Sequence, residues 1–152
     1  MEEAKAIRTL ILDTNVVISS LVKSEGITRA SLTILLHDEN CQVTAPAEVA
    51  EELKNHMEEI SSRSGIAQPL LEEVLGQLMK KIDLAPASLY ENKLDEALRF
   101  VRDESDAPFC ALALTRSPST IITYNKKHFN SRRLLQRHVR VRTPVEALRE
   151  LD

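Results

Sequence analysis

Residues 8–15 read RTLILDTN. The first five form a short, mainly apolar run that stops abruptly at the polar triplet Asp13-Thr14-Asn15. Such a run, followed by apolar residues at mixed spacing in 16–22, predicts a buried strand leading into a helix. We therefore expect residues 8–12 to be a strand of a parallel sheet, with Asp13 at its carboxyl end.

The same alternation continues along the chain. Further strands are expected in CQVTAP (41–46), KIDLAP (81–86), TIITY (120–124) and HVRVRT (138–143). Helices are expected at 28–38, 47–60, 68–80, 88–101 and 107–117. In the fourth helix, Ser88 and Glu91 have the spacing of a capping box. Five strands alternating with helices predict a three-layer α/β/α sandwich around a five-stranded parallel sheet.

The length and composition fit one globular domain, residues 1–152. A chain of 152 residues with 43% hydrophobic and 28% charged residues can bury a core, and is short for two domains. No apolar stretch approaches the roughly 20 residues of a membrane span, and the first residues do not resemble a signal peptide. Cys41 and Cys110 are far apart and interpreted as core residues. We expect a cytoplasmic protein with no membrane association.

The net charge of −3 hides an uneven distribution. Residues 126–142 hold seven Lys or Arg, two His and no acid, which leaves 13 basic residues against 23 acidic ones elsewhere, a net charge of −10. A basic strip beside an acidic body suits a metal-using enzyme that acts on a polyanion. The alternative is an ordinary solvated basic loop and helix.

Residues 47–60 place one acidic side chain beside a buried stripe. Val49, Leu53, Met57 and Ile60 share one face of the expected helix. Glu52 lies roughly 60° from Val49, at the edge of that face. The neighbouring Glu51 points to solvent, and Glu48, one turn earlier on the same edge, is the reserve candidate for a metal ligand.

Three acids from separate segments are candidates for one site. Asp13 follows a strand, Glu52 lies on a helix and Asp106 precedes the helix that begins near Ala107. In open parallel sheets, sites form beyond the carboxyl ends of the strands. Crowded carboxylates repel unless a cation neutralises them, and an oxygen-only ligand set favours Mg²⁺ or Mn²⁺. Alternatively, Asp13 and Asp106 are simple helix caps.

The order of ILDTN, AEVAEEL, RDESDAPFCALAL and TIITYNKKHF, over residues 8–142, resembles the PIN-domain family, including VapC-type toxins and archaeal-type PIN ribonucleases. The resemblance implies a Mg²⁺- or Mn²⁺-dependent endoribonuclease acting mainly on single-stranded RNA. It also implies a five-stranded parallel sheet and a homodimer, and for toxins an antitoxin partner.

The resemblance implies roles for individual residues. Asp13, Glu52 and Asp106 match the first three acidic positions of the family, and Asn15 matches a residue that supports the first. The fourth position, usually Asp, is Asn125 here. Its carbonyl oxygen can hold a metal-bound water, but it cannot act as a base.

Further residues complete the predicted site. Thr123 opens the element that contains Asn125 and is expected to support the site. Asp103 is expected to compensate, as a metal ligand, for the charge that Asn125 lacks. The basic strip supplies the residues expected to contact RNA phosphates without sequence specificity: Lys126, Lys127, Arg132, Arg133 and Arg137. Tyr124 and Phe129 are the nearby aromatic residues, and Phe129 is assigned to the core.

Two alternatives to an active nuclease follow from these residues. Asn125 also fits a degenerate PIN domain that binds RNA or a protein with little cleavage. A toxin and an RNA-processing nuclease are not distinguished by the residues, although the additional helix at 68–80 favours the second. A haloacid-dehalogenase phosphatase is excluded because Asn15 occupies the position of its second Asp.

Overall fold

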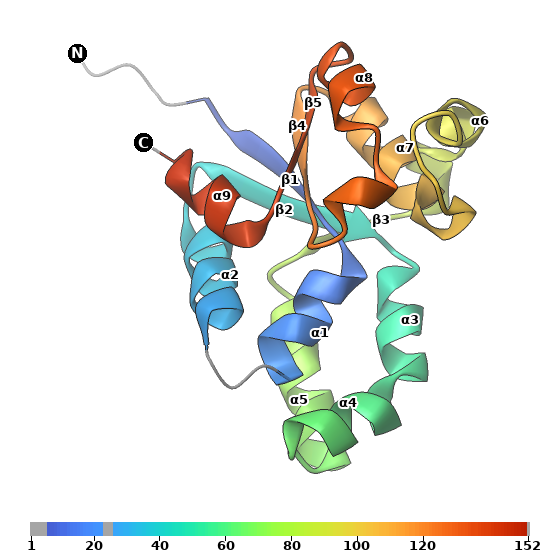
Figure 1. Cartoon of the computed structure of the whole chain (residues 1–152). Helices are drawn as coiled ribbons and strands as arrows, with labels where there is room; N and C mark the ends of the chain where they lie inside the picture. Colours follow the sequence, from blue (N-terminus) through green and yellow to red (C-terminus); the bar gives the residue numbers. More distant parts are fainter. Residues whose placement is uncertain (1–5, 23–25, 152) are drawn as a thin grey trace.

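The computed structural model describes residues 6–22 and 26–151, whose strands form a five-stranded parallel sheet (Figure 1). The strands are β1 (Arg8–Leu12), β2 (Cys41–Pro46), β3 (Asp83–Ala85), β4 (Ser119–Ile122) and β5 (Val139–Arg142). They lie in the order β3-β2-β1-β4-β5, and every neighbouring pair is parallel. The predicted sheet is confirmed, with β1 at its centre.

Helices cover both faces of this sheet, as the three-layer prediction requires. The α-helices are α1 (Thr14–Val22), α2 (Ile27–His37), α3 (Val49–Asn55), α4 (Met57–Ser64), α5 (Gln68–Met79), α6 (Leu94–Ala97), α7 (Ala107–Thr115), α8 (Ser131–Leu135) and α9 (Pro144–Arg149). Helix α7 packs on β1, β2 and β4 and carries α6 on its outer side, whereas α2 packs on β2 and α9 (Figure 1). Helix α5, the longest of those described, has 12 residues, so none of them could span a membrane.

The layers follow from where the apolar residues lie. Leu10, Ile11 and Leu12 of β1 are all buried, the pattern of a strand covered on both faces. Helix α7 buries six of its nine residues, Cys110 and Leu112 among them. A helix that is apolar on nearly all sides belongs inside a fold, and here it forms the central helix of one layer.

The sheet has a switch point between β1 and β4. From β1 the chain proceeds to β2 and β3 on one side, and from β4 it proceeds to β5 on the other. Connections that leave in opposite directions open a crevice at the carboxyl ends of the two strands. The residues that follow these strands are Asp13 and Thr123.

The expected helix at 47–60 is two helices. Helix α3 ends at Asn55, and α4 begins at Met57 after His56, whose φ of −102° and ψ of 9° interrupt the regular geometry. Asn and His are weak helix formers, which favours a break at this point. Residues 61–64 continue α4 until Gly65 ends it at a φ of 75°.

The expected helix at 88–101, with its Ser88–Glu91 capping box, was wrong. Residues 87–93 form two 3₁₀ turns, Ala87–Leu89 and Glu91–Lys93, and only α6 is α-helical. Between the turns, Tyr90 has a φ of −128° and a side chain that is only 3% exposed. Burying this large ring turns the backbone out of the helical path.

Candidate active site

The first predicted acid, Asp13, lies at the switch point and is nearly inaccessible, with 5% of its surface exposed. Its backbone N–H donates to the carbonyl of Ile122 at 3.0 Å, which continues the β1–β4 pairing by one residue. The hydroxyl of Thr123 donates to Oδ2 of Asp13 at 2.8 Å, and the side-chain amide of Asn15 donates to the same oxygen at 3.2 Å. Both predicted supporting residues therefore contact Asp13 directly.

The second acid, Glu52, is positioned by the residue after Asp13. The hydroxyl of Thr14 donates to Oε2 of Glu52 at 2.8 Å and links α1 to α3. Glu52 is partly buried and Glu51 is exposed, in agreement with the helical phase expected from the sequence. Thr14 had not been predicted as a site residue, because a Thr at the start of a helix is ordinarily read as a cap.

The third acid, Asp106, belongs to the 3₁₀ turn Glu104–Asp106 directly before α7. Its side chain makes no capping hydrogen bond to α7, so the simple capping interpretation does not apply. Instead Oδ2 of Asp106 lies 3.2 Å from Nδ1 of His128, whose turn, Lys126–His128, follows β4. His128 is a site residue that the sequence analysis missed, although it lay within the basic strip.

Two further acids were candidates. Asp103 caps the turn Glu104–Asp106 by accepting the backbone N–H of Ser105 at 3.0 Å, and it is exposed. That hydrogen bond lowers the pKa of Asp103. Glu48 is exposed, and burial together with the charge of Glu52 raises its pKa. Asp103 therefore serves as a cap, and Glu48 faces the edge of the acidic group.

The three central acids influence one another electrostatically. The pKa of Asp13 is raised from 3.8 to about 6, mainly by burial and also by the charges of Asp106 and Glu52, against the lowering effect of Thr123 and the Asn15 backbone. Burial also raises the pKa of Asp106, with contributions from Asp103 and Glu52, while His128 lowers it. A cation in their midst would relieve this repulsion.

The donor set fits a hard divalent cation. Side-chain hydrogen bonds fall on one oxygen of each carboxylate, namely Asp13 Oδ2, Glu52 Oε2 and Asp106 Oδ2, so a ligand can approach the other oxygen without breaking them. Within residues 6–22 and 26–151, no three His, Cys, Asp or Glu side chains stand close enough to enclose an ion as they are. Mg²⁺ keeps several waters and often binds one or two carboxylates, so it suits such an open arrangement.

Asn125 lies beside this group at the start of the turn Lys126–His128. Its side chain is exposed and makes no capping hydrogen bond, while its backbone N–H donates to the Thr123 hydroxyl at 3.0 Å. Thr123 thus joins Asp13 and Asn125 through one hydroxyl group. The contact is through the backbone, so a carboxylate in place of the amide would preserve it.

The predicted RNA-binding residues fall into two groups. Lys127 and Arg132 are exposed, without an ion pair to any residue that the structure describes. The other three have intramolecular partners: Lys126 pairs with Glu146 at 2.9 Å, Arg133 and Arg137 lie over the ring of Phe100 at 5.1 and 5.7 Å, and Arg137 also pairs with Glu96.

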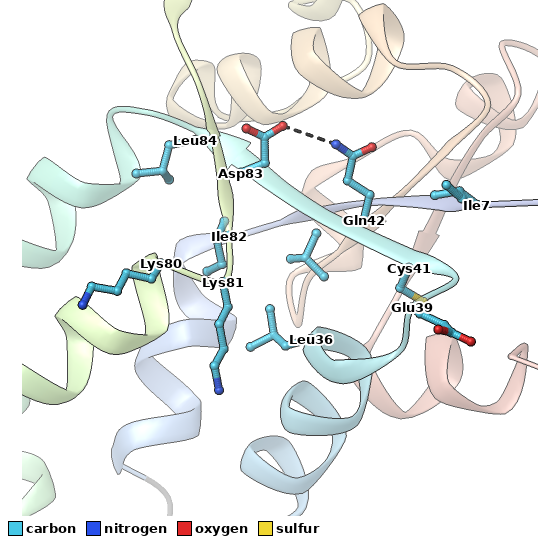
Figure 2. A pocket seen from close by; sticks show the side chains of 11 residues that line it. Ile7, Leu36, Glu39, Cys41, Gln42, Lys80, Lys81, Ile82, Asp83 and Leu84 are labelled. Atoms are coloured by element: carbon cyan, nitrogen blue, oxygen red, sulfur yellow. Dashed lines mark hydrogen bonds between the residues drawn. The ribbon is translucent and has the colours of Figure 1, made fainter.

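A large cavity lies elsewhere. It has a volume of about 750 Å³ and is lined by residues near the start of β2 and around β3, including Gln42, Lys80, Lys81 and Asp83 (Figure 2). Gln42 donates to Asp83 at 3.4 Å across its rim. The cavity is at the amino end of β2, whereas Asp13 follows the carboxyl end of β1, so it does not contain the acidic site.

Acidic residues at the switch point of a parallel sheet define a class of α/β/α protein with its site at the strand ends. Within that class, the model of the PIN domain matches residues 11–136. The chain therefore belongs to the PIN domain family, and the resemblance in its sequence is confirmed.

A solved structure supports the fold. The chain is similar to a chain of VapBC2 from Rickettsia felis, whose crystal structure was determined bound to a DNA fragment from their promoter. The TM-score is 0.61 at 15% identity, over 88% of this chain and 98% of that one. At this identity the likeness concerns the fold. Among curated proteins, none matches the chain significantly.

Proposed function

We propose that this protein is a Mg²⁺- or Mn²⁺-dependent endoribonuclease that hydrolyses phosphodiester bonds, mainly in single-stranded RNA. The observation that carries the proposal is that Asp13, Glu52 and Asp106 come from three distant segments and lie near enough for the charges of Asp106 and Glu52 to act on Asp13, whose pKa burial and these charges raise to about 6. Such crowding destabilises a fold, so its persistence at a crevice favours a cationic ligand.

Asp13, Glu52 and Asp106 would hold the cation. When bound, a divalent cation neutralises charge on phosphate oxygens and lowers the pKa of a water molecule. Thr123 and Asn15 orient the Asp13 carboxylate, and Thr14 orients that of Glu52. These hydrogen bonds reduce the freedom of the acids before any ligand arrives, which is the preorganisation that a catalytic site needs.

Asn125 would act through its carbonyl oxygen. The side chain is exposed next to Thr123, where it can accept a hydrogen bond from a water or contact substrate. It cannot take a proton, so the proposed reaction has no base at this position. Asp103 caps a turn through Oδ1 alone, so its other oxygen is left for the cation, and we propose it as the additional ligand expected from the sequence.

The substrate is proposed to be single-stranded RNA because the basic strip borders the acids. Exposed Lys127 and Arg132 offer charge to a phosphate backbone, and Lys126 can join them if its pair with Glu146 opens. Phe129 is buried, so it offers little surface for base stacking. We therefore expect weak sequence discrimination.

The test is cleavage of an end-labelled single-stranded RNA with and without Mn²⁺. We expect Mn²⁺-dependent cleavage that EDTA abolishes and that Asp13→Asn and Glu52→Gln reduce to the EDTA level. Glu51→Gln is the matched control, because it removes the same charge from the exposed neighbour and should cut like the wild type. The ribonuclease assignment would be contradicted if the folded wild type showed no metal-dependent cleavage, or if Glu51→Gln lost as much cleavage as Glu52→Gln.

The competing function is a degenerate PIN domain that binds RNA or a protein without cutting. Asn125 favours it, because it replaces the usual fourth acid. The substitution Asn125→Asp separates the two functions. If the natural site is active, the cleavage rate should change only a few fold. A large gain in the cleavage rate would indicate that the natural site is nearly inactive. RNA binding without cleavage over a range of Mn²⁺ concentrations would also favour the degenerate domain.

The cellular role and assembly are also proposals. We propose a single PIN domain, residues 1–152, that works in the cytoplasm as a homodimer. The likeness to a VapBC2 chain supports an antitoxin as a candidate partner, and a small gene adjacent to this one would favour a toxin over an RNA-processing enzyme. Light scattering of the purified chain, alone and with that neighbour's product, tests both the dimer and the partner.

A further inference from the structure

A second cavity, of about 660 Å³, lies between residues 99–102 and residues 126–132. The two segments are joined by an antiparallel bridge between Val101 and Phe129, flanked by backbone hydrogen bonds of 2.9 and 2.7 Å. This pairing connects parts of the chain that are far apart in sequence. It brings basic residues that precede Asp103 against basic residues that follow β4.

The lining of this cavity is strongly basic. Its cationic residues are Arg99, Arg102, Lys126, Lys127 and Arg132, and no acidic residue is among those that line it. Lys126 is paired with Glu146. The other four are exposed, and none forms an ion pair with a residue in the described part of the chain.

Four uncompensated cations around one cavity are unusual in a chain with a net charge of −3. Nearby, Arg137 is neutralised by Glu96 and, like Arg133, stacks on Phe100, so these side chains have a structural role. Acidic partners are therefore available in this chain but absent from this cavity. Concentrated positive charge in a concave site favours an anionic ligand.

The two segments that line the cavity also carry residues of the acidic site. Asp106 comes four residues after Arg102, which lines one wall. His128 comes directly after Lys127, which lines the other wall, and its Nδ1 lies 3.2 Å from Oδ2 of Asp106. A nucleic-acid strand in the cavity would therefore contact the same two segments that position Asp106 and His128.

We propose that this basic pocket binds a phosphate of the RNA strand flanking the one that is cut, with Arg99 and Arg102 as its main ligands. The inference rests on the proposed ribonuclease function and adds a substrate-binding subsite to it. Phe100 and Phe129 line the pocket but are 3% and 4% exposed, so they present little ring surface to a base. The pocket therefore recognises the backbone and not the sequence.

The test measures binding in EDTA, where neither metal nor cleavage contributes. A fluorescent single-stranded RNA of a dozen nucleotides is titrated with the wild type and with Arg99→Gln/Arg102→Gln. Glutamine keeps a polar side chain but removes the charge, and the hydrogen bonds of the bridge are made by the backbone, so both substitutions preserve them. We expect about tenfold weaker binding at low salt, and a salt dependence whose slope falls by roughly 0.7 per lost phosphate contact.

Lys80→Gln/Lys81→Gln is the matched control. It also removes two exposed charges beside a cavity of similar volume, at the amino end of β2 (Figure 2). We expect this variant to bind RNA like the wild type with an unchanged salt slope. We also expect Lys127→Gln/Arg132→Gln, on the opposite wall, to resemble the Arg99/Arg102 variant, and uridine and adenosine oligomers to bind equally.

The result separates this inference from the proposed function. If the wild type binds RNA through Arg99 and Arg102 but never cuts it, the pocket assignment stands and the nuclease assignment fails. If the Arg99/Arg102 variant binds like the wild type, if the Lys80/Lys81 control loses as much, or if the wild type does not bind RNA, the pocket assignment is overturned. The pocket assignment is also overturned if an acidic peptide binds the pocket and RNA does not.

Discussion

The hydroxyl of Thr123 donates a hydrogen bond to Oδ2 of Asp13 at 2.8 Å, across 110 positions of sequence. The same hydroxyl oxygen accepts the backbone N–H of Asn125 at 3.0 Å. Thr123 is fully buried, so water does not compete with it for either hydrogen bond. One side chain thus connects the ends of β1 and β4 and positions two of the proposed site residues.

Replacing Thr123 by Val tests this connection. Val preserves the shape but leaves both Asp13 and the Asn125 N–H without their partner, so we expect the free energy of unfolding to fall by about 1–3 kcal/mol. The pKa of Asp13 should rise, because a hydrogen bond that lowers it is lost. Thr123→Ser keeps the hydroxyl and is the control. Urea unfolding that shows Val to be as stable as Ser would contradict the proposed role.

Asp13→Asn should stabilise the fold at neutral pH. The folded-state pKa of about 6 exceeds the unfolded value of 3.8, so the folded state binds the proton more tightly. Ionisation of Asp13 therefore costs stability progressively as pH rises from about 4 through 6, and the full cost of about 3 kcal/mol remains above that range.

The comparison is urea unfolding of wild type and Asp13→Asn across this pH range. As pH rises, we expect the free energy of unfolding of the wild type to fall by about 3 kcal/mol relative to that of the variant. The difference between the two proteins removes the contributions of other titrating groups that are not coupled to Asp13. A difference that is constant with pH would show that the carboxylate is not perturbed by burial.

Mn²⁺ should stabilise the wild type through the same acids. A ligand that binds only the folded state raises stability by about 2.7 kcal/mol at one hundred times its dissociation constant. We expect Mn²⁺ to raise the melting temperature of the wild type and of Glu51→Gln, and to have little effect on Asp13→Asn or Glu52→Gln. Equal shifts in all four proteins would indicate binding elsewhere.

Glu146 predicts an opposite pH dependence. Hydrogen bonds from the Thr143 backbone and Lys126 lower the pKa of Glu146 to about 2, from 4.5. Its charge therefore contributes stability above about 4.5, and this contribution is lost as pH falls toward 2. Glu146→Gln should be less stable than the wild type near neutral pH and about as stable near pH 2, when the unfolding of both proteins is measured at each pH. A difference in stability that does not change with pH would contradict this.

Thr143 is the companion test for the same helix start. Its side chain accepts the N–H of Glu146 in a capping box at the start of α9. Thr143→Ala should cost about 1 kcal/mol through the lost cap, and only a small part of this cost should depend on pH, since the Thr143 side chain is the smallest of the causes that lower the pKa of Glu146. A cost confined to neutral pH would mean that the substitution acts through Glu146.

The strand segments along the chain and the helical phase of Glu52 could be predicted because they depend on local patterns. The run 8–12 is confirmed as β1, and the helical phase that distinguished Glu52 from Glu51 matches their burial. Both arguments use periodicities of a few residues. The capping box of Thr143 and Glu146 follows an equally local pattern, although the sequence analysis does not predict α9.

Long-range pairing explains most of what the sequence did not predict. The bridge between Val101 and Phe129 places Arg99 and Arg102 in the basic pocket, and no periodicity indicates such a bridge. His128 meets Asp106 only because the turn after β4 folds toward α7. The helix expected at 88–101 failed for a related reason, since burial of Tyr90 overrides local helix preference.

The most direct test of the metal site is an anomalous difference map from a crystal soaked in Mn²⁺. The account predicts one strong peak at the carboxyl ends of β1 and β4, coordinated by Asp13 together with Glu52, Asp106 or both, directly or through water. The same crystal with no peak there, or with Mn²⁺ bound only at other carboxylates, would contradict a metal-dependent site built on these three acids.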